Sequence, residues 1–343
     1  MSFWAESPGP HWSDWLKTKF LKQPIPVATP IRRTQVPLAE ETKYKNIGEL
    51  QPRDCEALTV FLQTHFKITK KSQCRITEKQ IRESMAKGWV WGIMKSGLDP
   101  RGIILGSIVS RPLGDCAFLF NEGRHSPLRR SFAKNTGYID FFCVHPDFQK
   151  GKVGSALLQW IDSKTSIQGR HIHFFQKELT PLVRLPPIWV GHYIVRENIR
   201  NIPTSSVTIV APSELATIIE KPGLQITFPS YVGEATKLYK YTSELFLFYV
   251  AITDTYHTNI KGGGKIGEVL WTEFVPKTKQ QFYKIENSAM EKIVEASGYS
   301  VLLMDSTLPH QQFVGWKTDS TYYLYAYNLN PRRFFTVRPA FWL

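Results

Sequence analysis

One segment near the middle of the chain, residues 138–161, constrains the fold more than any other. Tyr138 to Val144 is a mostly apolar run of strand length, and a helical run extends from Ser155 to Ile161. The loop between them, Gln149 to Gly154, carries two glycines and two lysines. A helix start after such a loop offers backbone N–H groups and a positive dipole end to an anion. The segment therefore predicts a pyrophosphate cradle, and an ordinary strand-to-helix turn with glycines for geometry is the alternative.

The elements before this segment fit the same kind of core. Asp54 can cap a helix with an apolar stripe, and Thr77 with Gln80 marks a second helix start of the capping-box type. Trp89 to Met94 and Gly102 to Val109 have the pattern of two strands joined by a turn. The predicted order of helix, helix, hairpin, strand, loop and helix resembles an N-acetyltransferase core.

The second half of the chain follows a similar plan more loosely. We therefore predict an α/β fold of two N-acetyltransferase-like lobes that form a mixed, saddle-shaped sheet flanked by helices. Residues 1–45, rich in proline and aromatic residues, are expected to form an extended arm, and the lobes span 46–205 and 206–343. The expected elements of the second lobe are a helix after Ser213, strands near Leu245–Ile252 and Ile266–Val275 around a tip at Gly262–Gly264, a helix at Phe282–Ala296, and strands at Tyr299–Met304 and Tyr322–Tyr327.

Composition narrows the classes of partner. The net charge of +14 implies an anion, which could be a nucleic acid, an acidic membrane surface or a polyphosphate such as coenzyme A. The basic residues are dispersed and no nucleic-acid-binding motif accompanies them, so we expect no nucleic acid. No apolar run approaches the roughly 18 residues that a membrane-spanning helix needs. We expect a soluble, cytoplasmic monomer with no transmembrane segment.

Cysteine and histidine patterns give no metal or disulfide signal. The four cysteines are scattered, with no Cys-x-x-Cys pair. Cys143 with His145 could be imagined as a nucleophilic dyad, but no orienting acid lies nearby, and packing is the favoured role for Cys143. His171 and His173 alternate on an expected strand but lack a third ligand. We interpret both histidines as surface or core residues.

The residues around the loop resemble the protein N-myristoyltransferase family, within the N-acetyltransferase-like fold. Asp140-Phe141-Phe142-Cys143-Val144-His145 is similar to the family's Asn-Phe-Leu-Cys-Val-His stretch. Lys150-Gly151-Lys152-Val153-Gly154 is similar to its Ser-Lys-Arg-Val-Ala loop, with Lys152 as the cation where acetyltransferases carry a glycine. Two further pieces agree in order: the arm that opens Ser2-Phe3-Trp4, and Gly315 followed by Tyr322-Tyr323-Leu324-Tyr325.

This resemblance implies transfer of a myristoyl group from myristoyl-CoA to the N-terminal glycine amine of protein substrates. It implies no permanently bound cofactor and no metal, because acyl-CoA is a co-substrate. The oxyanion hole falls to the backbone N–H groups of Phe141 and Phe142, and the base to the terminal carboxylate of Leu343. The first lobe would bind acyl-CoA with the arm packed on it, and the second would bind the peptide. The implied acyl-CoA contacts are Ser2, Phe3, Trp4, Cys143, Val144, Lys150, Gly151, Lys152, Val153, Gly154 and Ser155.

Three departures keep other functions open. Val195 stands where the family carries a histidine, Phe175 where it carries a substrate-facing threonine, and Asp140 where it carries an asparagine. One alternative is an N-acetyltransferase or another acyl-CoA-dependent amine acyltransferase. The other is a catalytically inactive scaffold that binds acyl-CoA or lipid.

Overall fold

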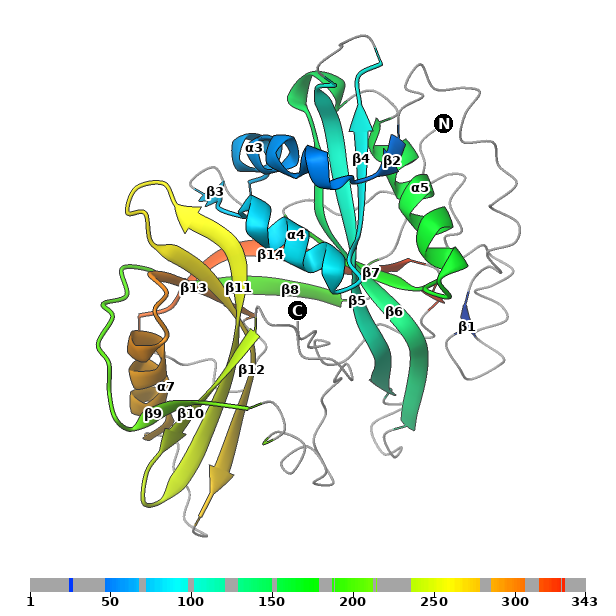
Figure 1. Cartoon of the computed structure of the whole chain (residues 1–343). Helices are drawn as coiled ribbons and strands as arrows, with labels where there is room; N and C mark the ends of the chain where they lie inside the picture. The colour runs from blue at the N-terminus through cyan, green and yellow to red at the C-terminus, as the bar shows by residue number, and fades with distance from the viewer. Residues whose placement is uncertain are drawn as a thin grey trace.

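The computed structural model describes residues 25–26, 47–67, 72–97, 102–120, 129–149, 153–178, 187, 189–211, 214, 236–277, 285–305, 315–327 and 329–330. These residues build one mixed 13-stranded sheet with helices packed on its faces, and a separate two-stranded sheet (Figure 1). The strand order is β2-β4-β5-β6-β7-β14-β8-β13-β12-β11-β10-β9, with β3 paired to β11. The predicted α/β class with a mixed sheet is therefore confirmed.

The elements fall into a short list. The helices are α3 (Cys55–His65), α4 (Glu78–Ala86), α5 (Val153–Ile167) and α7 (Ile285–Ala296), with 3-10 turns at Pro52–Asp54 and Pro146–Phe148. The strands are β1 (Ile25–Pro26), β2 (Ile47–Glu49), β3 (Ser72–Cys74), β4 (Val90–Lys95), β5 (Ile104–Phe120), β6 (Arg129–Val144), β7 (His173–Glu178), β8 (Trp189–Arg196), β9 (Val207–Val210), β10 (Thr236–Thr242), β11 (Phe246–Asn259), β12 (Lys265–Pro276), β13 (Val301–Asp305), β14 (Lys317–Tyr327) and β15 (Leu329–Asn330).

The same pattern of strand pairing occurs twice. In the first repeat, β4, β5 and β6 are antiparallel neighbours, α5 crosses over, and β7 returns parallel to β6. In the second repeat, β10, β11 and β12 are antiparallel neighbours, α7 crosses over, and β13 returns parallel to β12. β14 and β8 lie between the two repeats and join them into one sheet. A second lobe built on the plan of the first is what the sequence pattern predicted.

Alternation along the strands fills a core on each face of the first repeat. Trp91 and Ile93 of β4 point to the side covered by α3 and α4, and Val90 and Met94 point to the side covered by α5. The second repeat packs α7 on an aromatic-rich face of β10 and β11, whose central side chain Phe248 is fully buried. In each repeat a buried apolar core thus joins the helices to the sheet.

Several local expectations are confirmed and two are corrected. Thr77 and Gln80 form the predicted capping box. The first predicted helix exists, but Asp54 does not cap it, because its carboxylate pairs with Lys95 Nζ at 2.6 Å. The helix expected from Ser155 already begins at Val153, so the last two residues of the expected loop belong to its first turn.

Most of the expected strands form at the predicted positions, and several are longer than predicted. β5 and β6 extend well beyond the predicted Gly102–Val109 and Tyr138–Val144, and the Gly262–Gly264 triplet lies at the β11–β12 turn as predicted. Of the expected arm, only Ile25–Pro26 is described, and it pairs with Leu329–Asn330. The helix expected after Ser213 lies outside the described residues except at Glu214. No helix within the described ranges is long and apolar enough to cross a membrane.

Gly106 of β5 lets α5 lie close to the sheet and gives a stability prediction. A Cβ atom on Gly106 of β5 would lie 2.8 Å from Leu157 Cδ1 and 3.0 Å from Val153 Cγ1, both in α5. Gly106→Ala should therefore lower the free energy of unfolding by about 1–3 kcal/mol through overpacking. Gly48→Ala in β2 is the control, since a Cβ atom added there would have no neighbour within 4 Å. Equal urea midpoints for both variants would contradict the close packing of α5.

Candidate functional site

The site lies where β6 and β7 part. Their parallel register includes only Gly137 opposite His173 and Tyr138 opposite Phe174. Beyond that point β7 continues to pair with β14 along its other edge, from Phe175 to Glu178. The residues of β6 and β7 that follow the split line a cavity of about 620 Å³. Pockets for small ligands and cofactors have volumes of this order.

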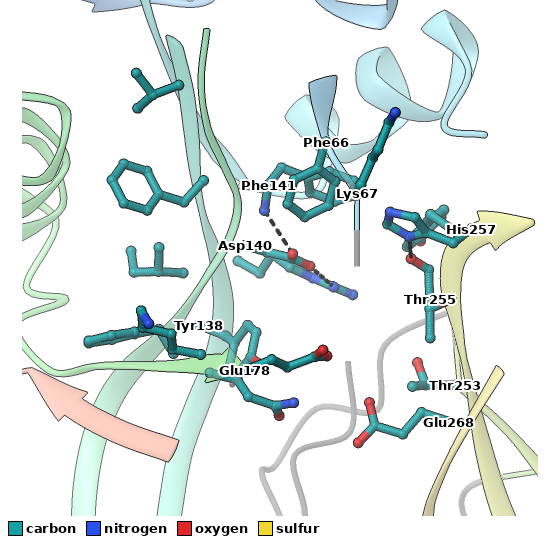
Figure 2. A pocket seen from close by; sticks show the side chains of 18 of the residues that line it. Phe66, Lys67, Tyr138, Asp140, Phe141, Glu178, Thr253, Thr255, His257 and Glu268 are labelled. Atoms are coloured by element: carbon teal, nitrogen blue, oxygen red, sulfur yellow. Dashed lines mark hydrogen bonds and ion pairs between the residues drawn. The ribbon is translucent and has the colours of Figure 1, made fainter. Parts of the chain in front are cut away.

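Four elements contribute most of the cavity lining. β6 contributes Tyr138 to Phe142 and Val144, and β7 contributes Phe175 to Glu178. The start of α5 lines it through Gly154, Ser155 and Leu158, and β11 lines the opposite side through Thr253 to His257 (Figure 2). Because both repeats contribute, the cavity lies between them.

A β-bulge shapes the β6 wall. Ser107 of β5 pairs with Cys143 and Val109 pairs with Asp140, so two residues of β6, Phe141 and Phe142, stand opposite one residue of β5. Phe141 has a φ of 45°, the left-handed region that non-glycine residues rarely adopt. A bulge turns backbone groups out of the strand ladder. The distortion thus lies at Phe141 and Phe142, the two residues to which the family resemblance assigns the oxyanion hole.

Asp140 holds the bulge in place. Its Oδ1 accepts the Phe141 N–H at 2.7 Å, and its Oδ2 receives Arg111 Nη1 at 2.7 Å. The Arg111 guanidinium also lies 4.2 Å from the centre of the Trp89 ring, a cation–π contact. The Phe141 ring is buried among Trp91, Phe66 and Tyr256, whereas Phe142 is 39% exposed. The Phe141 N–H is therefore directed at a carboxylate, which the sequence analysis did not foresee.

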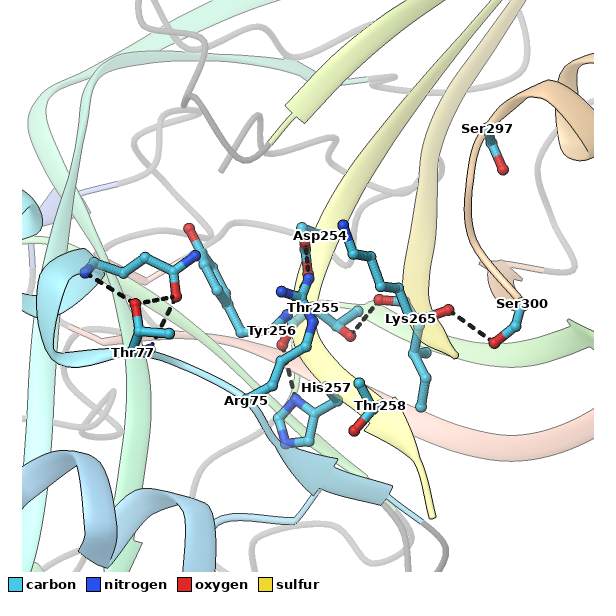
Figure 3. Close-up of polar contacts among 12 residues, drawn as sticks. Arg75, Thr77, Asp254, Thr255, Tyr256, His257, Thr258, Lys265, Ser297 and Ser300 are labelled. Atoms are coloured by element: carbon cyan, nitrogen blue, oxygen red, sulfur yellow. Dashed lines mark hydrogen bonds and ion pairs between the residues drawn. The ribbon is translucent and has the colours of Figure 1, made fainter. Parts of the chain in front are cut away.

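The opposite wall carries a comparable arrangement on β11. Asp254 Oδ1 accepts the Tyr256 N–H at 2.7 Å, and Asp254 forms an ion pair with Arg75 (Figure 3). Tyr256 has a φ of 58°, and the register of β11 against β12 shifts between Asp254 and His257. Burial is the main cause of the raised pKa of the Tyr256 hydroxyl. Each bulge thus has an aspartate whose charge is balanced by an arginine.

The start of α5 meets the bulge across a narrow gap. A Cβ atom on Gly154 would lie 3.2 Å from Phe142 Cζ, so a larger residue there would press on that ring. Gly154 and Ser155 both line the cavity and belong to the first turn of a 15-residue helix. The N-terminal turn of a helix of this length is an anion-binding element.

The other residues singled out by the sequence analysis divide into two groups. Cys143 and Val153 point into the cores on either side of the sheet, and Val144 lines the cavity. Phe175 lines the cavity and stacks on Tyr325 at 5.0 Å, and Val195 packs beside Tyr193. The residues that lie outside the described part of the chain are Ser2, Phe3, Trp4, Lys150, Gly151, Lys152 and Leu343.

Polar residues gather where β7, β8 and β12 line the cavity. Gln176 Nε2 donates to Tyr193 Oη, and the Tyr193 hydroxyl donates to Glu268 Oε1 at 2.9 Å. Glu178 lies on the same wall as Gln176. Burial, and then the nearby charges of Glu268 and Asp319, raise the pKa of Glu178 to about 7. The sequence analysis missed these residues, because a glutamate on a strand with alternating pattern reads as a solvent-facing side chain.

The rival catalytic readings lose support. Burial raises the pKa of Cys143 to about 12, which leaves it a packing residue and not a thiolate nucleophile. His173 is 1% exposed and contacts Ser110 Oγ at 3.1 Å, and burial lowers its pKa to about 3. It is a core histidine, as interpreted from the sequence. Among the described residues, no cluster of three His, Cys, Asp or Glu side chains could hold a metal ion.

Comparison with known proteins gives a fold and no close relative. No protein-family model matches the chain, and no curated protein matches it in sequence. The structure is similar to Saccharomyces cerevisiae N-myristoyltransferase with bound myristoyl-CoA, with a TM-score of 0.62, 12% identity, and coverage of 96% of this chain and 93% of that chain. A structure of the yeast enzyme with bound myristoyl-CoA and inhibitors gives a TM-score of 0.62 at 10% identity, covering 96% and 90%. The resemblance noted in the sequence is therefore confirmed as a shared fold.

The ion pair behind the bulge supplies a prediction for this site. Asp140→Asn keeps an oxygen for the Phe141 N–H but leaves the Arg111 side chain, 5% exposed, without its carboxylate. We expect the free energy of unfolding to fall by about 3 kcal/mol, because breaking a buried ion pair leaves a charge uncompensated. Urea denaturation measures this loss. Asp147→Asn is the control, since that carboxylate is 80% exposed.

The double variant Asp140→Asn/Arg111→Met tests the same cause. Removing both charges should recover part of the lost stability. A double variant no more stable than Asp140→Asn would show that the Arg111 charge is not the source of the loss.

Proposed function

We propose that the chain is an acyltransferase that moves a myristoyl group from myristoyl-CoA to the N-terminal glycine amine of protein substrates. The observation that carries this proposal is the opening between β6 and β7 beside the Phe141 bulge, with the first turn of α5 at its edge. One opening thus combines an anion-binding helix start, a distorted strand and a cavity of about 620 Å³. The fold shared with yeast N-myristoyltransferase supports the choice of donor.

In this proposal the donor lies between the two strands. Its pyrophosphate is held by the start of α5 at Gly154 and Ser155 and by the preceding loop with Lys150, Gly151 and Lys152. Val144 contacts the coenzyme A part of the donor. Cys143 and Val153 contact the donor through their backbone atoms, since their side chains lie in the cores. The arm with Ser2, Phe3 and Trp4 covers the donor.

The reaction needs no nucleophilic side chain. The amine nitrogen, once it has lost its ammonium proton to a base, attacks the thioester carbon and forms the C–N bond. The C–S bond then breaks. The nitrogen loses its second proton, which passes to the departing thiolate, so that CoA leaves as a thiol. Backbone N–H groups stabilise the oxyanion, a role we assign to Phe141 and Phe142 at the bulge. Because the Phe141 N–H already donates a hydrogen bond to the Asp140 carboxylate, we assign the larger share of oxyanion stabilisation to the Phe142 N–H.

The proposal also assigns a binding role to each lobe and a cellular compartment to the reaction. Residues 46–205, with the arm 1–45, bind the donor, and residues 206–343 bind the peptide. Cys55, Cys74 and Cys143 are unpaired thiols, which fits a reducing compartment such as the cytoplasm. We propose that the protein acts there as a monomer on glycine-initiated proteins, without nucleic acid.

A transfer assay tests this function. Purified protein is offered myristoyl-CoA and acetyl-CoA in competition, with peptides that begin with glycine or with alanine, and products are measured by mass spectrometry. We expect one myristoyl group on the glycine peptides alone. Acetyl transfer would replace the proposal with a short-chain amine acyltransferase. Donor binding without any product would replace it with an inactive scaffold.

The base that we propose, the terminal carboxylate of Leu343, gives a second prediction. Appending three residues after Leu343 moves the carboxylate away, so turnover should fall roughly 10²–10⁴-fold, the usual contribution of a general base. Myristoyl-CoA affinity should stay unchanged. Leu343→Ala is the control, because it alters the side chain and keeps a carboxylate at the same place. An extended protein that remains fully active would exclude Leu343 as the base.

A further inference from the structure

A buried polar cluster lies at the closed end of the gap, where β6 and β7 are still paired. It is formed by Ser110 on β5, Arg170 just before β7, and His173, the first residue of β7. Arg170 Nη1 donates to the Ser110 hydroxyl at 3.1 Å and to the Ser110 carbonyl at 3.3 Å. His173 Nε2 contacts the same hydroxyl at 3.1 Å. The Ser110 hydroxyl thus joins the other two side chains.

Gly137 of β6 makes room for the cluster. β6 lies between β5 and β7 in the sheet, so the contact between Ser110 and His173 passes over it. A Cβ atom on Gly137 would lie 2.7 Å from Arg170 Cδ and 2.8 Å from both Ser110 Oγ and His173 Cδ2. Gly137 is also the first β6 residue paired with β7, and its N–H donates to the Ile172 carbonyl at 2.9 Å. The cluster therefore links three strands at the pair that ends where the gap begins.

The cluster also holds the C-terminal part of α5. Thr165 Oγ1 lies 3.3 Å from His173 Nε2, and the Thr165 carbonyl accepts the Arg170 N–H at 3.0 Å. The first turn of the same helix brings Gly154 and Ser155 into the cavity lining. Because α5 is one continuous helix, a contact that fixes its last turns against β7 also fixes where its first turn stands beside the gap.

Stability alone is a poor account of this cluster. Arg170 is 6% exposed, and within the described ranges it forms no ion pair with a carboxylate. Burying a charge without a partner costs free energy, and well-packed apolar side chains are often as stable as a buried polar group. Burial, and then the charges of Arg170 and His171, lower the pKa of His173 to about 3, so its ring is neutral at neutral pH. A buried, hydrogen-bonded cluster can instead specify one arrangement of the elements around it.

We propose that Arg170, Ser110 and His173 are positioning residues of the donor site, which fix the point where β6 and β7 part and the place of α5 beside the gap. This inference rests on the proposed function, because it concerns the same gap and the same donor. None of the three side chains is part of the cavity lining, whereas Tyr138 and Phe175, which follow the paired residues on each strand, do line it. The cluster therefore acts through the strands and the helix and does not touch the donor.

Donor binding to Arg170→Met tests the proposal, because methionine keeps an aliphatic stem and lacks the hydrogen-bond donors. We expect the Kd for myristoyl-CoA, measured by calorimetry, to rise about 3–30-fold, the usual range for residues that act on a ligand without contacting it. The number of sites per folded protein should stay unchanged. A variant that had only lost folded protein would show fewer sites and the wild-type Kd. Arg170→Lys keeps a charged donor for Ser110 and should bind closer to the wild type than Arg170→Met.

Ser110→Ala is the second variant, since it removes a single oxygen atom and breaks the link between Arg170 and His173. It should weaken donor binding in the same direction, and it decides the test even where Arg170→Met does not fold. Amide hydrogen exchange locates the effect: the Gly137 N–H should exchange at least about tenfold faster in both variants, and amides of the β10–β11 pair should keep their wild-type rates. Ile293→Val in the core beneath α7 is the control for lost stability, far along the sheet from the cluster.

The outcomes separate this inference from the proposed function. Wild-type affinity for myristoyl-CoA in both Arg170→Met and Ser110→Ala overturns the positioning role, and acyl transfer by the same variants leaves the acyltransferase standing. An equal loss of affinity in Ile293→Val also overturns it, because lost stability is then the cause. Weaker binding confined to the cluster variants supports it, even when the transfer assay gives no product. Wild-type protein that does not bind myristoyl-CoA removes the proposed function and this inference together.

Discussion

The separation of β6 from β7 is the constraint on which the rest of the site depends. A parallel pair that stops after two residues leaves two strand edges facing each other without a continuous ladder between them. The structure tolerates this because β5 and β14 still pair with the outer edges of the two strands. The gap is therefore built into the sheet itself. The bulge at Phe141 and the start of α5 both open onto it, so a helix N-terminus and the distorted backbone share one cavity.

Charge is distributed unevenly around that gap. At each of the two bulges an aspartate accepts a backbone N–H and is neutralised by an arginine, Arg111 in one case and Arg75 in the other. At Glu178, the nearby charges of Glu268 and Asp319 add to the effect of burial in raising the pKa of the carboxyl group. The cavity thus brings the first turn of α5 and the carboxylates of Glu178 and Glu268 into one lining.

Local patterns in the sequence predicted the local structure. The Thr77–Gln80 capping box and the β4–β5 hairpin depend on residues close along the chain, and both form as expected. The Phe141–Phe142 position was reached through the family resemblance, and the bulge is there. Contacts between residues far apart in the sequence could not be predicted from local patterns. Asp54 pairs with Lys95 instead of capping its helix, and Glu178 meets Glu268 only because β7 and β12 are brought to one cavity by a sheet of 13 strands.

A crystal structure with a ketone analogue of myristoyl-CoA, which keeps the carbonyl but cannot be cleaved, tests the central claim most directly. The account predicts that the analogue lies between β6 and β7, with its pyrophosphate at the first turn of α5. Its carbonyl oxygen should lie about 3 Å from the Phe142 N–H, a hydrogen-bonding distance. An analogue bound elsewhere, or one whose carbonyl points away from the bulge, would contradict the assignment of this gap as the acyl-transfer site.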